Sequence, residues 1–306
     1  MPNDASLPND PQVPWTDEQW TRVSQVIQQE ASRARVAAAF LPLFGPLPAS
    51  TDFVRSELIS YPHIGHDRER QRIAIADRDT MRLPTLQVKV YVRSAQMADP
   101  EMTSVLALFR RAANVLARLE DALIFNGQRD EDQGPPRGLD GLPAVWDILG
   151  GETRRGLLSH EEEPQIHILA DGNSLVRGVS SSIGMLESSG HFGPFAVVLG
   201  QKLFVAAQTP NRDSLVLPQD RIIPFLGGGP LLRSSTLPED CGVVVALGGA
   251  PVELVVATDV SLAFLQLTTD PLFVFRVFEK IVLRIKEPNA IVALVPPNGR
   301  EGVIEA

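Results

Sequence analysis

Residues 99–127 read DPEMTSVLALFRRAANVLARLEDALIFNG and predict one very long helix. Asp99 can cap its first N–H groups, and Pro100 suits the first turn. Apolar side chains then recur at helical spacing, at Met102, Leu106, Phe109, Ala113, Leu116, Leu119 and Leu123. Asn126 and Gly127 end the pattern. At 1.5 Å per residue, the helix is expected to be a rod of about 40 Å.

A second amphipathic helix is predicted near the amino terminus. Thr16 and Gln19 have the spacing of a capping box, in which each side chain satisfies a backbone donor of the other residue. One narrow apolar face follows, formed by Trp20, Val23, Ile27, Ala31 and Ala34. Residues 51–79 are charged and turn-rich without a helical stripe, which predicts an extended arm.

The other segments predict mostly strands. Leu86, Val88, Val90 and Val92 alternate with polar side chains, the pattern of a strand with one buried face. Apolar runs at residues 195–199 and between 243 and 295 predict further strands, and residues 175–186 predict a helix. Residues 134–151 are rich in Gly and Pro and predict a long surface connection. The expected fold class is therefore α+β.

Composition narrows the function. The chain has 306 residues, enough for about two packing units, and its 28 basic and 37 acidic residues give a formal net charge of −9. That sign argues against a surface that wraps nucleic acid. The single cysteine, Cys241, allows no intrachain disulfide. No signal peptide and no apolar stretch near 20 residues is present, so we expect a soluble cytoplasmic protein with no membrane partner.

Several groups of polar residues have the side-chain types of catalytic or metal sites. His63, His66 and Asp67, and separately residues 160–163 with His167, have metal-ligand types but no spacing that converges on an ion, so solvated segments are favoured. Glu120 and Asp121 are adjacent on a helix and cannot face one glycosidic bond together, so surface ion pairing is favoured. Cys241 is expected to be a small buried hydrophobe. We therefore predict no enzyme activity, no cofactor and no metal.

Five segments in register resemble the encapsulins, bacterial and archaeal proteins that form hollow shells around enzymes. They are DEQW at 17–20, LFGPL at 43–47, LEDALIFNG at 119–127, HFGPFAVVL at 191–199, and PLFVFRV at 271–277 continuing through LRIKEPNA at 283–290. Each string is weak alone, but together they span residues 17 to about 294 in the order of that family.

The resemblance implies the fold of tailed-phage major capsid proteins. It implies a disordered tail at 1–15, an amino-terminal helix and turn at 16–50, and an extended arm at 51–79 that reaches a neighbour. A peripheral domain with the long spine helix would comprise residues 80–150 and 250–306, and an axial domain residues 151–249.

The resemblance also implies a structural function. The protein would assemble with itself into an icosahedral nanocompartment around a cargo enzyme that bears a targeting peptide, of the ferritin-like, hemerythrin or dye-decolorizing peroxidase type. The main alternative is a prophage capsid protein that packages DNA, although a helix beginning near residue 17 leaves little room for a scaffolding segment. A free hydrolase or a bacteriocin is a third possibility.

Two sets of site residues follow from the resemblance. A cargo-binding strip between the first helix and a carboxyl-terminal strand would involve Ile27, Ala31, Ala34, Ala38, Asp259, Val260 and Leu262, and would accept branched apolar side chains. A pore loop at the fivefold axis would involve Thr209, Pro210, Asn211, Arg212 and Asp213, which are polar or rigid.

Overall fold

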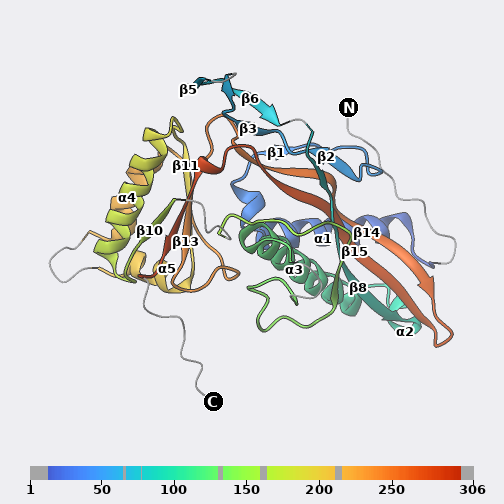
Figure 1. Cartoon of the computed structure of the whole chain (residues 1–306). Helices are drawn as coiled ribbons and strands as arrows, with labels where there is room; N and C mark the ends of the chain where they lie inside the picture. Colours follow the sequence, from blue (N-terminus) through green and yellow to red (C-terminus); the bar gives the residue numbers. More distant parts are fainter. Residues whose placement is uncertain are drawn as a thin grey trace, which may run out of the picture.

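The computed structural model describes residues 13–64, 67–76, 78–129, 134–158, 164–210 and 216–297. Two units of sheet and helix lie side by side, and a hairpin projects from them (Figure 1). The helices are α1 (Asp17–Ala34), α2 (Ser94–Met97), α3 (Thr103–Asn126), α4 (Gly172–Ser188), α5 (Gln201–Gln208) and α6 (Pro218–Ile222), with 3-10 turns η1 (Ala37–Ala39), η3 (Ile223–Leu226) and η4 (Pro288–Ala290).

The first unit is a five-stranded sheet with α1 and α3 packed against it. Its strands, in spatial order, are β1 (Leu43–Phe44), β14 (Val252–Leu267), β15 (Leu272–Ile285), β8 (Thr85–Arg93) and β9 (Trp146–Leu149). The predicted alternation on β8 is confirmed, since Leu86, Val88, Val90 and Val92 are buried. The segment expected to be a surface connection contains a strand, β9. It forms there because its backbone pairs with β8.

The amino-terminal segment begins the core earlier than expected. The sequence placed residues 1–15 in a disordered tail, but Val13 and Trp15 are buried. The Trp15 ring stacks on Phe275 of β15 with centroids 4.8 Å apart, because a large apolar ring is stabilised by such burial. Directly after it, the capping box of Thr16 and Gln19 forms as predicted and starts α1.

The long helix α3 is confirmed with a shifted start. It begins at Thr103, whose N–H donates to the Asp99 carboxylate over 3.1 Å, and its 24 residues make it about 36 Å long. It ends at Gly127, which has a φ of +80°. A Cβ at this position would lie 2.2 Å from the carbonyl oxygen of Arg154, so glycine is required where the chain turns back.

The second unit is another five-stranded sheet flanked by α4 and α5. Its strands, in order, are β10 (Gln165–His167), β16 (Ile291–Val295), β13 (Gly242–Ala246), β11 (Phe195–Leu199) and β12 (Leu231–Arg233). The sequence placed residues 250–306 wholly with the first unit, but η4 redirects the chain after β15 and β16 pairs with β13 in the second sheet. Burial of residues 291–294 stabilises that position.

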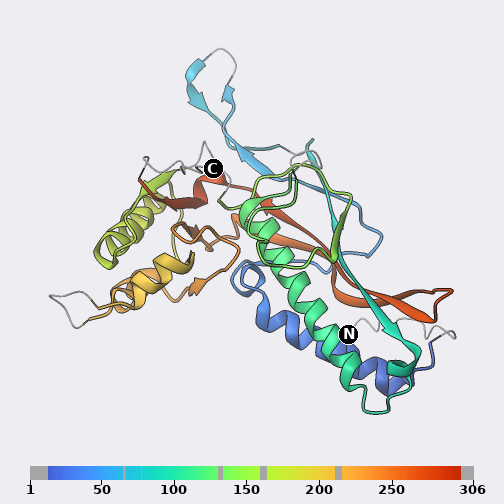
Figure 2. The same ribbon diagram turned by 90° about the horizontal axis from the view of Figure 1, so that it is seen from below.

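The predicted arm is a long antiparallel hairpin that projects away from both sheets (Figure 2). Three short ladders build it, formed by β2 (Phe53–Arg55) with β7 (Thr80–Arg82), β3 (Leu58–Ser60) with β6 (Ala74–Ala76), and β4 (His63–Ile64) with β5 (Asp67–Gln71). Its base is held by Arg284 of β15, which donates to the Arg55 carbonyl over 3.1 Å and pairs with Glu57.

The described helices include none with the length and apolar character needed to cross a lipid bilayer.

Candidate functional site

A buried charge cluster joins the end of α1 to α3 and to the first sheet. Arg35 follows α1 directly, and its Nε lies 2.5 Å from Glu120 Oε2 of α3. Its Nη1 donates to Asp259 Oδ1 of β14 over 2.9 Å, and its Nη2 pairs with Glu279 of β15. We call these residues, with Asp121, the Arg35 cluster. Glu120, Asp121 and Glu279 are buried, while the Asp259 side chain is 68% exposed.

The sequence interpretation of Glu120 and Asp121 as surface residues is therefore wrong. Asp121 accepts hydrogen bonds from the backbone N–H groups of Val36 and Ala37, at 3.0 and 2.8 Å to Oδ1. Glu120 faces Arg35 instead. The two carboxylates thus hold the backbone in place directly after α1. The sequence did not indicate these contacts, because the partners lie 84 to 85 residues away.

Burial sets the protonation of this cluster. It raises the pKa of Asp121 and of Glu279 to about 7, and it raises the pKa of Glu120, helped by the nearby Glu279 carboxylate, well above its usual range. Burial alone would lower the pKa of Arg35, but Glu279, Glu120 and Asp259 outweigh it and raise that pKa. The cluster therefore retains a proton near neutral pH, because one guanidinium cannot balance several buried carboxylates.

A groove runs between α1, β14 and β15 and encloses about 540 Å³. We call it the α1 groove. Its lining comprises Ser24, Ile27, Gln28, Ala49, Thr85, Thr258, Val260, Ser261, Leu262, Arg276, Phe278 and Lys280. Its apolar members Ile27, Val260 and Leu262 are at most 2% exposed, so its accessible apolar surface includes the half-buried Phe278 and the exposed Ala49.

The expected cargo-binding residues are thus brought together only in part. Ile27, Val260 and Leu262 line the α1 groove. Ala31 is buried in the core at 1% exposure, and Ala34 and Ala38 are half-buried outside the groove lining. Asp259 is bound to Arg35. Ala31 is not part of an exposed strip, because α1 packs this face against α3 and β14.

The α1 groove contains residues that the sequence analysis missed. Arg276, Phe278 and Lys280 alternate along β15 and therefore share one face of the sheet. Charged residues inside a long apolar strand run are unusual, and this was the signal that could have identified them.

The other candidate residues from the sequence lie outside the α1 groove and the Arg35 cluster. Thr209 and Pro210 of the expected pore loop are exposed at the end of α5, while Asn211, Arg212 and Asp213 lie outside the described residues. His63 and His167 are exposed, and His66 and residues 160–163 are also outside them. Within the described part of the chain, no group of three His, Cys, Asp or Glu side chains could hold a metal ion. Cys241 is buried, and burial raises the pKa of its thiol to about 12.

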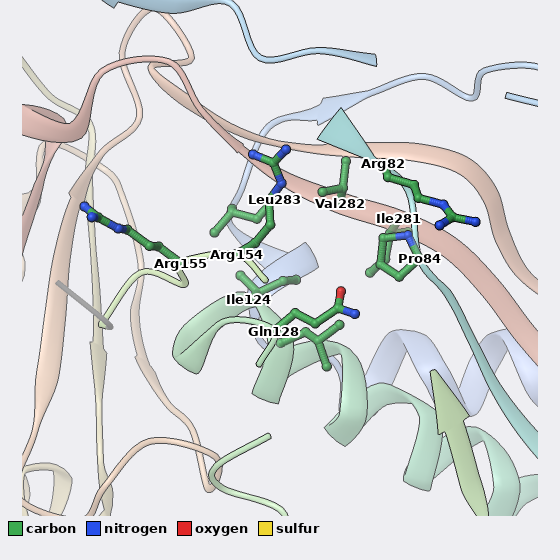
Figure 3. Close-up of a pocket in the computed structure, with 10 residues that line it drawn as sticks. Arg82, Pro84, Ile124, Gln128, Arg154, Arg155, Ile281, Val282 and Leu283 are labelled. Carbon is green, nitrogen blue, oxygen red and sulfur yellow. The ribbon is translucent and has the colours of Figure 1, made fainter. Parts of the chain in front are cut away.

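A small cavity lies between α3, β15 and the base of the hairpin (Figure 3). Its volume of about 30 Å³ suits one or two water molecules rather than an organic substrate. Arg82, Arg154 and Arg155 surround an apolar floor that includes Ile124 and Leu283, and Arg154 donates to the Thr80 carbonyl over 3.2 Å. The residues around this cavity therefore anchor the base of the hairpin.

The fold is shared with proteins that form capsids and virus-like particles. A virus-like particle from Pyrococcus furiosus is similar at a TM-score of 0.65 and 17% identity, covering 90% of this chain and 99% of that one. The capsid of Myoviridae phage XM1 is similar at a TM-score of 0.55 and 12% identity, covering 83% of this chain and 89% of that one. These similarities establish the fold of tailed-phage major capsid proteins.

A family model described as an encapsulating protein for peroxidase, Linocin_M18, matches residues 8–135 and 145–282. The chain therefore belongs to the encapsulin family of shell proteins. It is similar to the type 1 encapsulin shell protein EncA of Myxococcus xanthus, with 27% identity over 291 residues, 92% of this chain and 93% of that protein. It is also similar to a diheme-cytochrome-encapsulin shell fusion protein of Kuenenia stuttgartiensis, with 22% identity and coverage of 90% and 72%.

Proposed function

We propose that the chain assembles with copies of itself into a closed hollow shell that encloses a cargo enzyme. Family membership and the capsid fold support this proposal. The first sheet with α3 would form the peripheral domain of each subunit, and the second sheet with α4 and α5 the axial domain near the symmetry axes. In this role the chain acts as a structural protein with no catalytic step of its own.

The projecting hairpin is the single observation that carries the proposal. It exposes large apolar side chains, with Phe53 59%, Tyr61 52%, Ile73 77% and Ile75 59% exposed. A two-stranded ribbon has no core of its own and is marginally stable in water. Contact with neighbouring subunits would bury these side chains and order the ribbon, as a closed shell requires.

The cargo is proposed to be an enzyme of the ferritin-like, hemerythrin or dye-decolorizing peroxidase type that carries a targeting peptide. The family description, an encapsulating protein for peroxidase, supports this class. We place the shell in the cytoplasm, as a nanocompartment. The α1 groove is the proposed docking site, because it is large enough for a short extended peptide and lies between α1 and β14, where the family resemblance implies the cargo-binding strip.

Pores at the symmetry axes are proposed to admit the substrates of the cargo. Residues 209–213 follow α5 in the sequence, and Thr209 and Pro210 are exposed. If Arg212 lines such a pore, Arg212→Ala should change the entry of small anions into the shell while assembly is retained.

Expression of the full chain with and without its genomic neighbours tests the proposal. The expected result is a hollow particle that retains one enzyme and contains no nucleic acid. Particles filled with DNA would instead support the phage capsid alternative, which the capsid-like fold alone does not separate from a shell.

A further inference from the structure

The α1 groove carries basic side chains beside its apolar ones. Of the described residues that line it, Arg276 and Lys280 are the charged ones, and none is a carboxylate. Three acidic residues lie beside the lining, and each is paired with a cation: Asp52 with Lys280, and Asp259 and Glu279 with Arg35. The groove therefore carries a positive charge on a chain whose formal net charge is −9.

Lys280 and Arg276 differ in how far they are neutralised. Lys280 Nζ lies 2.5 Å from Asp52 Oδ1, so its charge is balanced within the subunit. Arg276 has no carboxylate partner among the described residues. Its one polar contact there joins Nη1 to Gln87 Oε1 at 3.5 Å, a marginal hydrogen bond, and its buried Nε has no hydrogen-bond partner.

Neighbouring side chains hold the Arg276 guanidinium in place. Its carbon lies 4.3 Å from the centroid of the Phe278 ring, two residues along the same face of β15. Arg276 is half-buried, so an anion that reaches it would be partly shielded from water. A planar guanidinium with unused N–H donors binds a carboxylate through two parallel hydrogen bonds, with little loss of side-chain freedom when it is already fixed.

The groove also sets the length and form of its occupant. It follows β14 from Thr258 to Leu262 and β15 from Arg276 to Lys280, five residues on each strand. At about 3.3 Å per residue this is roughly 16 Å, the span of an extended segment of about five residues. Phe278 offers the occupant an apolar contact beside Arg276.

We propose that the α1 groove binds an extended cargo segment through an Asp or Glu side chain that pairs with Arg276, next to an apolar side chain that packs on Phe278. This inference rests on the proposed function and specifies its partner: the targeting segment is acidic at one position. The observation behind it is an unpaired, immobilised guanidinium in a groove whose described lining contains no carboxylate.

A tag selection in assembled shells tests the inference. Green fluorescent protein bearing a randomised seven-residue carboxyl-terminal tag is co-expressed with the full chain, shells are purified by size, and the retained tags are sequenced. The free carboxyl terminus is the same in every tag, so it cannot create a difference between them. We expect Asp or Glu to be enriched at one position about tenfold or more over Asn and Gln.

Variants of the groove assign that preference. In Arg276→Gln shells the acidic preference should disappear, and in Arg276→Glu shells tags with Lys or Arg should replace it. Ser261→Glu, on the neighbouring strand of the groove, should remove the acidic preference while Arg276 is kept. Arg33→Gln is the matched control, because Arg33 is exposed at the end of α1 outside the groove lining and its loss should change nothing.

Three outcomes would overturn the inference while leaving the proposed shell intact. They are shells that retain no tag above background, tags without acidic enrichment, and an enrichment that persists unchanged in Arg276→Gln shells. Failure of the wild-type chain to form particles would count against the proposed function itself. If Arg276→Glu does not assemble, the Arg276→Gln and Ser261→Glu shells still decide between the outcomes.

Discussion

Arg35 holds α1 in place through charge rather than through apolar contact. It meets Glu120 and Glu279 where both are buried, so its loss would leave carboxylates in the core without a cation. Breaking such a pair from one side costs much more than the pair contributes, because the remaining charge stays desolvated.

We expect Arg35→Met to lower the stability of the subunit by about 3–5 kcal/mol. Arg33→Met, two residues earlier and exposed, should change it by less than about 0.5 kcal/mol. Chemical denaturation at a fixed subunit concentration measures both. Equal midpoints for the two variants would show that the Arg35 cluster does not position α1.

The protonation of Glu279 predicts a dependence of stability on pH. Its pKa is about 7 in the folded chain against 4.5 for an ordinary glutamate, so the folded state binds more protons between these values. Stability from this group is therefore full below about pH 4.5 and is lost as pH rises through about 7. Each such proton changes the free energy of unfolding by at most about 1.4 kcal/mol per pH unit.

In Glu279→Gln, the thermal midpoint should fall less steeply between pH 5 and pH 8. Some decline should remain, because the pKa of Asp121 is also about 7. Glu239→Gln is the control, because Glu239 pairs with Lys202 at the surface. The interpretation fails if Glu279→Gln and the unchanged chain show the same slope over this range.

At the scale of elements, the hairpin contributes to assembly more than to the fold of the subunit. It lies outside both cores, and its base is held separately by Arg284, which pairs with Glu253 over 2.6 Å through Nε. Removing the outer part should therefore leave the two sheets intact.

Replacing residues 58–76 with Asn-Gly, which favours a turn, keeps the β2–β7 ladder and removes the exposed side chains of Tyr61, Ile73 and Ile75. We expect the circular dichroism in the near ultraviolet to change little and closed particles to be lost. Closed particles of normal size from this variant would show that the hairpin is not an assembly element.

Local patterns predicted local elements, whereas pairing between distant segments escaped prediction. The capping box at Thr16 and the alternation on β8 depend on neighbours in sequence, and both are present in the structure. β9 and β16 were misplaced because their partners are far along the chain. The Arg35 cluster was missed for the same reason, and an apolar stripe on α1 could not reveal that Ala31 faces the core.

The whole molecule has the form of a shell subunit. Two units built on separate sheets are joined at the end of α3, where the Asn126 side chain donates to the Thr236 carbonyl over 2.9 Å, and a hairpin extends from them (Figure 2). Encapsulin membership and the capsid fold support the proposal that many copies of this subunit enclose a space.

The mass and shape of the purified full chain test this account most directly. An icosahedral shell needs at least sixty copies, about 2 MDa for a 33.3 kDa chain. Light scattering combined with negative-stain microscopy should therefore show closed, hollow particles of at least this mass at physiological salt. A stable monomer under the same conditions, with no particles in the images, would contradict the proposal that this chain forms a shell.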